Sequence, residues 1–370
     1  MWIYLVSIAV LLVLSFYAPW FVVSNLNIQA KKKKWIWLFG SVTGVAIINV
    51  YCWIMISGNY THSDSLYGVL YNVSGLLFML QIYFVMTSVV LSIVLNLGFC
   101  RHSKMRALFA LVTMILPVSV AGYGWLKAQS FSITQINVDI DKLDHPITFV
   151  HIPDVHLGHQ RDASYLNEIF RAIEPYKPQF ILYNGDLFDS NRALNEQTQK
   201  ILAQQNIPQF YTDGNHEFYM DREKALSLLK NAGVKTLNSE MITIDGIQLV
   251  GLEYMNADSV SKDAHSVNNL TMDEELPKII IDKNLPIIVA HHSPIGIKYI
   301  LDYGADIYLS GHTHAGQIFP ATWLVSINFP YYKGVFTLGK TKVIVSEGAG
   351  TFGPWMRLGS KNEIQIITLN

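Results

Sequence analysis

Apolar residues are concentrated in the first third of the chain. Four long and nearly uncharged stretches, separated by short polar breaks, cover residues 2–23, 35–57, 71–97 and 107–126. A helix needs about 20 apolar residues to cross a bilayer, so each stretch predicts a transmembrane helix. The first stretch lacks the basic start and small-residue cleavage site of a signal peptide, and we therefore expect it to be retained.

The pattern changes from residue 147 onward to short apolar strands that alternate with amphipathic segments. Strands are predicted at 147–152, 180–183, 209–212, 248–251, 287–290 and 307–309, and helices at 163–173, 194–204 and 222–232. The tail predicts β hairpins from 335–338, 342–346 and 363–369. This order is typical of a layered α/β domain. We therefore expect a four-helix transmembrane anchor (1–126), a connector (127–146) and an α/β domain (147–370).

Composition supports this division and excludes several classes of protein. The chain of 370 residues is 51% hydrophobic and only 15% charged, against roughly 25% in soluble domains. Only seven of the 27 basic residues and one of the 28 acidic residues precede residue 127. Disorder and nucleic acid binding through a basic field are therefore not expected. A transporter is the alternative to an anchor, but the only ionisable residue at a span is Arg106, at a boundary.

Polar residues with catalytic potential follow the predicted strands directly. The clusters are Asp154 and His156; Asp186 and Asp189; Asn215 and His216; His291 and His292; and His312 and His314. Each cluster alone is an ordinary turn sequence. Five of them in succession, each after an apolar strand, indicate one site at the ends of the strands.

Oxygen and imidazole ligands without cysteine suit Mn²⁺, Fe²⁺ or Zn²⁺, and so much histidine disfavours Mg²⁺. One ion needs three or four protein ligands, whereas the clusters offer seven: Asp154, His156, Asp186, Asn215, His292, His312 and His314. Seven ligands suffice for two ions if one carboxylate bridges them. Two such ions can clamp a phosphate and activate water.

The ordered motifs resemble the calcineurin-like metallophosphoesterase superfamily over about residues 147–370. They are Asp-x-His, Gly-Asp-x-x-Asp, Gly-Asn-His-Glu, His and Gly-His-x-His, and they end in Gly-His-Thr-His-Ala-Gly-Gln. That run and the segment 346–351 look most like a bacterial, membrane-associated phosphodiesterase branch. The resemblance implies an α/β/β/α sandwich that holds two divalent metal ions, with Mn²⁺ as the first choice.

The resemblance also implies a role for each residue. Asp154, His156 and His314 would bind the first metal, Asn215, His292 and His312 the second, and Asp186 would bridge the two. His292 is preferred to His291 because His292-Ser293-Pro294 matches the family's His-x-Pro spacing. His216 would contact the scissile phosphate or protonate the leaving oxygen, oriented by Asp189 or Asp213, and Asn215 would also contact the substrate.

The resulting hypothesis is a membrane-anchored phosphoesterase that uses in-line attack by a metal-bound hydroxide. A phosphodiester is favoured over a monoester, and its source is a phospholipid-linked or cell-envelope phosphoester. Trp355 and Arg357 are candidates for contacts to such a substrate at an apolar rim. Two alternatives stay open: another metal-dependent hydrolase, although no His-Glu-x-x-His motif is present, and an inactive receptor or scaffold that retains the fold.

Basic residues predict the orientation in the membrane. They lie only in the first and third breaks, at Lys31–Lys34, Arg101, Lys104 and Arg106, whereas the second break carries Asp64. Basic loops stay in the cytoplasm. The catalytic domain is therefore expected outside the cytoplasm, on a bacterial plasma membrane.

This orientation predicts the behaviour of reporters fused after Asn370. A reporter that functions only outside the cytoplasm should be active, and one that functions only in the cytoplasm should be inactive. The reverse result would show that the predicted topology is wrong.

Overall fold

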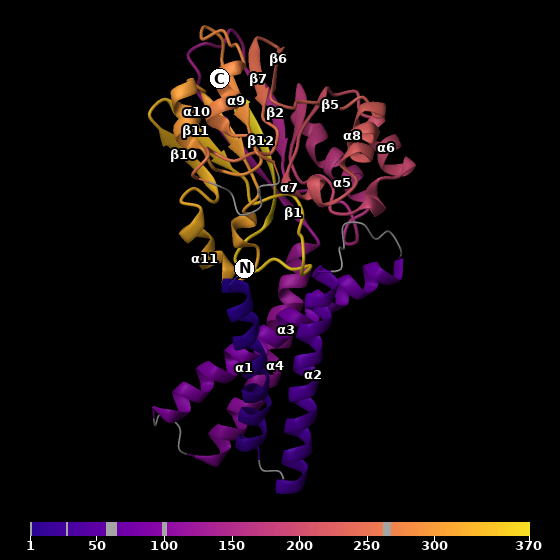
Figure 1. Ribbon diagram of the computed structural model, residues 1–370, viewed down its shortest axis with the longest axis vertical. Coiled ribbons are helices and arrows are strands. Elements are labelled where there is room, and N and C mark those ends of the chain that lie inside the picture. Colours follow the sequence, from indigo (N-terminus) through magenta and orange to yellow (C-terminus); the bar gives the residue numbers. More distant parts are fainter. Residues whose placement is uncertain (1, 27–28, 57–64, 98–101, 262–267) are drawn as a thin grey trace. The chain divides into compact units, whose positions relative to one another are not determined.

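The computed structural model describes residues 2–26, 29–56, 65–97, 102–261 and 268–370 (Figure 1). The chain divides into two compact units. The helical unit comprises Met1–Asn59, Leu66–Lys127 and Gly353–Met356, and the α/β unit comprises Tyr60–Ser65, Ala128–Phe352 and Arg357–Asn370. Asp64 and Arg101, which entered the prediction of orientation, lie outside the described residues.

The helical unit contains α1 (Trp2–Asn25), α2 (Ala30–Ile56), α3 (Ser65–Asn96) and α4 (Ser103–Ala128). Among the residues that the structure describes, three segments of this unit are long and apolar enough to cross a membrane: Ala30–Ile54, Ser65–Asn96 and Ser103–Ala128. Three of the four predicted spans are therefore supported. The first predicted span is the helix α1, and its crossing of a membrane stays a prediction.

Polar contacts connect the helices of this unit. The Gln81 side chain of α3 donates from Nε2 to Ser15 Oγ of α1 at 3.2 Å. Gly44 of α2 lies against the same amide, where an added Cβ would collide with it. Small residues allow such close approach between helices in a membrane.

The short segment Gly353–Met356 belongs to the helical unit although it comes from the end of the chain. The Gly353 N–H donates to Tyr71 Oη at 2.7 Å, and the Trp355 ring meets the Trp125 ring edge-on at 6.4 Å. The last part of the chain therefore contributes to both units.

The α/β unit is built on two six-stranded sheets. The first sheet has the order β1 (Phe131–Val138), β12 (Asn362–Leu369), β2 (Ile147–Ile152), β3 (Phe180–Asn184), β4 (Gln209–Thr212) and β5 (Lys235–Thr236). The second has the order β10 (Gly334–Leu338), β11 (Thr341–Val345), β9 (Ile307–Ser310), β8 (Ile287–Ala290), β7 (Ile247–Gly251) and β6 (Glu240–Ile244).

Side chains alternate between the two faces of each sheet, as the pleat of a strand requires. Ile147 and Phe149 of β2 join the core that also contains Ile288 and Ile307 of the second sheet. Val150 instead packs with α5 (Ser164–Ile173), α6 (Glu196–Ala203) and α8 (Arg222–Asn231). The other face of the second sheet packs with α9 (Met272–Glu275) and α10 (Ile297–Tyr303). These three cores define four layers in the order α/β/β/α.

The remaining helical elements are short. They are α7 (Asn215–Tyr219), α11 (Ala321–Asn328) and 3-10 turns at Glu174–Tyr176, Asn191–Ala193, Leu276–Lys278 and His314–Gly316. Two of them, α7 and the turn at His314–Gly316, begin at residues of the predicted metal clusters.

All six strands predicted for the central sheets are present within one residue of their expected bounds, and the three helices are present within two. The connector prediction is wrong in part. Residues Phe131–Val138 form β1, which pairs in parallel with β12 from Phe131↔Asn362 to Val138↔Leu369. The hairpin of β10 and β11 is confirmed, but β12 lies between β1 and β2 instead of forming a hairpin. Pairing between such distant segments leaves no local pattern.

Candidate metal centre

Both sheets direct their polar loops to one place. The neighbouring strands β2, β3 and β4 are parallel, as are β7, β8 and β9. Parallel strands end at the same edge of a sheet. The residues that follow these strands therefore converge: Asp154, His156, Asp186, Asp189, Asn215, His216, His292, His312 and His314.

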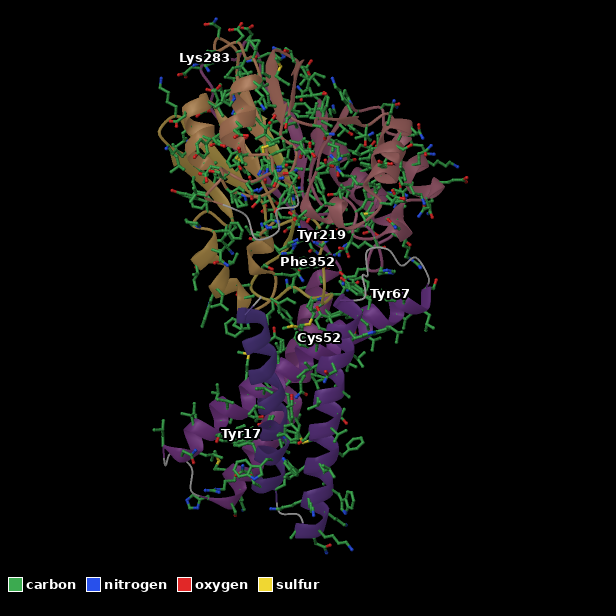
Figure 2. The ribbon with its side chains drawn as sticks, viewed as in Figure 1. Tyr17, Cys52, Tyr67, Tyr219, Lys283 and Phe352 are labelled. Atoms are coloured by element: carbon green, nitrogen blue, oxygen red, sulfur yellow. The ribbon has the colours of Figure 1, made fainter. Side chains whose placement is uncertain are left out.

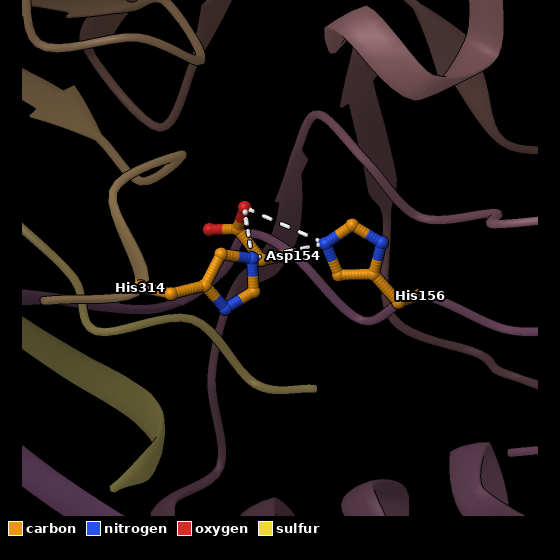
Figure 3. A group of neighbouring side chains, drawn as sticks. All are labelled: Asp154, His156 and His314. Carbon is orange, nitrogen blue, oxygen red and sulfur yellow. Dashed lines mark hydrogen bonds and ion pairs between the residues drawn. The ribbon is translucent and has the colours of Figure 1, made fainter. Parts of the chain in front are cut away.

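Within the described parts of the chain, three overlapping groups of side chains have possible ligand atoms within 4.8 Å of one another. They are Asp154, His156 and His314; His156, Asp186 and His216; and Asp186, His292 and His312. Figure 3 shows the first group, in which Asp154 Oδ1 lies 3.3 Å from His314 Nε2 and 3.9 Å from His156 Nε2. The two imidazole Nε2 atoms are 3.0 Å apart. At this distance the two nitrogen atoms are directed to the same position, where a single metal ion could contact both.

Asp186 lies between the groups. Its Oδ2 is 3.1 Å from His292 Nε2 and 3.8 Å from both His156 Nε2 and His216 Nε2. Its Oδ1 accepts the His216 backbone N–H at 2.9 Å. This shared position is the one that a bridging carboxylate would occupy.

The surroundings of two buried polar atoms show whether these residues fit a metal ion. Asn215 Oδ1 is buried and has no hydrogen-bond partner in the described part of the chain, and the buried His292 Nε2 makes no hydrogen bond of good geometry there, although it lies 3.1 Å from Asp186 Oδ2. His292 Nδ1 donates to the Asn184 carbonyl at 2.8 Å, which directs Nε2 toward Asp186. Buried polar atoms without partners are costly, and metal ligation would satisfy both.

His291 and His292 have different surroundings. His291 Nδ1 donates to the Ser293 carbonyl at 2.7 Å, and its Nε2 accepts the Met255 N–H at 3.2 Å. Both nitrogens of His291 therefore bond to backbone, so this ring supports the loop. His292 is the member of the pair that reaches Asp186.

The electrostatics favour cations at this place. Burial alone would raise the pKa of Asp154 and Asp186, but nearby imidazoles, His292 among them, hold both values below the usual range. Burial would likewise lower the pKa of His292, yet these two carboxylates raise it to about 10. A position that stabilises a proton on an imidazole also stabilises a divalent cation in its place.

Five of the predicted ligands have left-handed backbone conformations. Their φ angles are 57° at Asp154, 52° at His156, 51° at Asp186, 66° at His312 and 47° at His314. Each such residue other than glycine costs about 1–3 kcal/mol and persists only where surrounding structure enforces it. These sharp turns begin directly after the buried strands β2, β3 and β9.

Glu217 connects two of the loops from a buried position. Its carboxylate accepts the backbone N–H groups of Asp186 at 3.1 Å, Phe188 at 3.1 Å and Gly214 at 2.9 Å. An added Cβ on Gly214 would collide with the Asp186 carboxylate, so only glycine allows this approach. Glu217 is the last residue of the Gly-Asn-His-Glu motif, and the motif alone did not predict this role.

His216 is held by Asp189. Its Nδ1 lies 2.7 Å from Asp189 Oδ1, which also lies 3.3 Å from His156 Nδ1. Burial lowers the pKa of His216, but Asp186 and Asp189 oppose this effect and raise it to about 9. The other predicted partner, Asp213, pairs instead with Arg222, whose Nη2 lies 2.5 Å from Asp213 Oδ2.

The predicted substrate contact of Arg357 is wrong. Arg357 is fully buried, and its guanidinium donates to Asn362 Oδ1 and to the carbonyl oxygens of His314, Glu347, Gly348 and Gly350. Its Nη2 also lies 3.0 Å from His314 Nδ1. Its Nη1 also donates to Ser360 Oγ, so each of the three guanidinium nitrogens is engaged within the protein and none is left for a substrate. Trp355 lies in the helical unit, and its substrate role stays a prediction.

A cavity of about 200 Å³ adjoins the cluster. Its lining is Asp186, Asn215, His216, Tyr219, His312, Thr313, His314, Val325, Phe329 and Phe352. Figure 2 labels Tyr219 and Phe352. The Phe352 ring lies 5.0 Å from the His314 ring, and the Phe329 ring lies 5.8 Å from the His312 ring. No sequence signal indicated Tyr219, Val325 or Phe329 as lining residues.

Known proteins resemble this chain in sequence. Residues 147–316 match the family described as calcineurin-like phosphoesterase. The metallophosphoesterase Cj0846 of Campylobacter jejuni is 29% identical over 273 residues, 72% of this chain and 70% of that protein. The metallophosphoesterase YkuE of Bacillus subtilis is 24% identical over 284 residues, 73% of this chain and 97% of that protein.

A relative from Danio rerio has the name "transmembrane protein with metallophosphoesterase domain". It is 29% identical over 275 residues, which cover 70% of this chain and 62% of that protein. The chain therefore spans less than two thirds of this relative. Together with the three long apolar helices, this similarity supports a membrane protein.

The geometry predicts unequal effects of two neighbouring substitutions on metal binding. Asp186→Asn should weaken metal binding more than Asp189→Asn, because Asp186 adjoins two ligand groups whereas Asp189 only orients histidines. Loss of an orienting partner costs about 10- to 100-fold in metal affinity. Competition titration with a chelating dye measures both affinities. Equal losses would contradict a bridging position for Asp186.

The buried guanidinium predicts a stability effect. Arg357→Lys should lower the Tm by about 5 °C or more, because each carbonyl left without a donor costs about 1–3 kcal/mol. Arg171→Lys, at an exposed arginine of α5, is the matched control and should leave the Tm within about 1 °C. Thermal unfolding of the full chain in detergent checks this. Similar shifts in the two variants would mean that the Arg357 contacts contribute nothing.

Proposed function

Because residues 147–316 are a calcineurin-like phosphoesterase domain, we propose that this membrane protein is a dinuclear-metal phosphodiesterase acting at the membrane surface. The family match confirms the superfamily that the motifs predicted, and it implies a metal-dependent phosphoester hydrolase. The observation that carries the proposal is the position of Asp186, which two of the three groups of potential ligands share.

The residues present fit two ions. In this proposal Asp154, His156 and His314 hold the first ion, Asn215, His292 and His312 hold the second, and Asp186 contacts both. Nitrogen and oxygen donors without thiolates favour Mn²⁺, with Fe²⁺ or Zn²⁺ as alternatives. Two such ions, when bound, lower the pKa of water and neutralise charge on the phosphoryl oxygens.

His216 acts as the general acid in this proposal. Its Nδ1 is fixed on Asp189 at 2.7 Å, and the ring lines the cavity with Asn215 and Phe352. The Asp189 carboxylate raises the pKa of the ring, which favours the protonated form that can donate a proton to the leaving oxygen. Asp189 holds the tautomer and direction of the ring, and Asn215 contributes a contact to the phosphate.

The substrate in this proposal is a phosphodiester borne by the membrane or the cell envelope. The apolar helices hold the catalytic domain on a bilayer, which a soluble substrate does not require. The basic first and third breaks of the anchor support an extracytoplasmic site. The membrane in this proposal is a bacterial plasma membrane, and Campylobacter and Bacillus, the sources of two of the relatives, are bacteria. The proposal involves no nucleic acid.

The test of the activity uses the purified full chain in detergent micelles. With Mn²⁺ present it should hydrolyse bis-p-nitrophenyl phosphate faster than p-nitrophenyl phosphate, and a chelator should abolish the activity until Mn²⁺ is restored. Asp186→Asn should be inactive, whereas Asp302→Asn, at an exposed carboxylate of α10, should match the wild type. Absence of hydrolysis in a wild type that binds metal would favour a receptor or scaffold.

The role of His216 predicts a separate effect on turnover. His216→Asn should lower kcat by about 10²- to 10⁴-fold, the range of general acid catalysis, with unchanged metal content. Steady-state kinetics and elemental analysis of the same preparation measure the two quantities. A kcat within a few-fold of the wild type would exclude His216 as the general acid.

A further inference from the structure

The helix α11 (Ala321–Asn328) exposes a large apolar surface in the α/β unit. Trp323, Leu324 and Ile327 are 73%, 56% and 75% exposed. At about 100° per residue these side chains lie within one arc of the helix. The helix contains no charged residue. Exposed apolar groups gathered in this way mark a contact surface rather than ordinary surface variation.

The opposite side of the same helix belongs to the catalytic cavity. Val325 of α11 and Phe329, the residue directly after the helix, line the cavity, and the Phe329 ring meets the His312 ring edge-on at 5.8 Å. The helix begins five residues after the 3-10 turn at His314–Gly316. A partner that contacts the exposed face of α11 therefore binds a helix that also forms part of the cavity wall.

The chain itself indicates that a lipid bilayer is close to this surface. The helix α4, which is long and apolar enough to cross a membrane, ends at Ala128, and β1 begins at Phe131. At no more than about 3.6 Å per residue, the sheet begins within about 11 Å of the end of a span. A bilayer surface is therefore always close to the α/β unit.

We propose that α11 is an interfacial membrane helix, with Trp323, Leu324 and Ile327 inserted at the boundary between lipid headgroups and acyl chains. Tryptophan prefers this boundary, and a helix without charges enters it without transferring an ion out of water. The contact of α11 with the membrane does not depend on the proposed activity. The consequence for the substrate does rest on the proposed function. With α11 at the interface, the cavity would open where lipid headgroups are presented, so the substrate would be a lipid-borne phosphodiester.

A second copy of the chain is the main alternative occupant. The helix is about 12 Å long, and its three exposed side chains offer less than the roughly 800 Å² that each partner contributes to a stable dimer. Lipid needs no such minimum area, because each apolar side chain transfers independently. These quantities favour the bilayer.

Depth-dependent fluorescence quenching tests the contact in the full chain. Ile327→Cys is introduced together with Cys52→Ser and Cys100→Ser, labelled with NBD and reconstituted in phosphatidylcholine nanodiscs with or without doxyl-labelled lipid. The matched control is Ile280→Cys, at another isoleucine of the α/β unit, which is 86% exposed. We expect blue-shifted emission and strong quenching by the doxyl lipid at position 327, and neither at position 280.

Two outcomes would overturn the proposal. Unquenched, unshifted emission at position 327 would mean that α11 faces water. A blue shift without quenching by lipid would mean that protein covers the helix. Both readings are independent of catalysis.

A kinetic comparison tests the consequence for the substrate. Ile327→Glu should lower kcat/KM for a diester carried in micelles by about tenfold, since a charge at the interface is unfavourable, and should leave hydrolysis of bis-p-nitrophenyl phosphate unchanged. Equal rates of the variant and the wild type on the micellar diester would overturn the consequence. Absence of hydrolysis of both substrates by the wild type would contradict the proposed function, while the quenching result would still decide the membrane contact.

Discussion

The carboxylate of Asp186 is buried, and an isolated charge in such a place costs several kcal/mol. The structure offsets this cost with imidazoles from three loops, at His156, His216 and His292, and with the backbone N–H of His216. Those loops follow strands of two different sheets. The attraction to one anion therefore requires both sheets to end at the same place, and Glu217 strengthens this by bonding the loops after β3 and β4 to each other.

The same requirement explains the backbone strain around the site. The side chains of a strand point to the two faces of its sheet and not to the space beyond its end. The chain must therefore turn sharply at the first loop residues to bring their side chains into the site. Asp154, Asp186 and His312 adopt left-handed backbone conformations, which are uncommon for residues other than glycine. The packed strands that precede these residues resist relaxation, because interiors at crystal-like density have no room for a shifted backbone. Strain in the loops is thus balanced by packing in the sheets.

Local patterns predicted the local features of this protein. The central strands and the positions of the polar clusters follow from runs of apolar residues and the groups after them, and the structure brings those clusters together as expected. Partnerships between distant segments were not predictable in this way. Asn362 opposes Phe131 through pairing of β1 with β12, and Arg357 is buried because distant carbonyl groups surround it. The local sequence around a polar residue does not show whether its side chain is exposed near the end of the chain or buried in the core.

The connection between the anchor and the catalytic domain is more than a single tether. A tether would join the two units at one point of the chain, whereas the segment Gly353–Met356 belongs to the helical unit and its two neighbours belong to the site. Phe352 lies against the His314 ring, and Arg357 donates to the His314 carbonyl. The chain therefore enters and leaves the segment Gly353–Met356 through two residues, Phe352 and Arg357, that contact a predicted ligand.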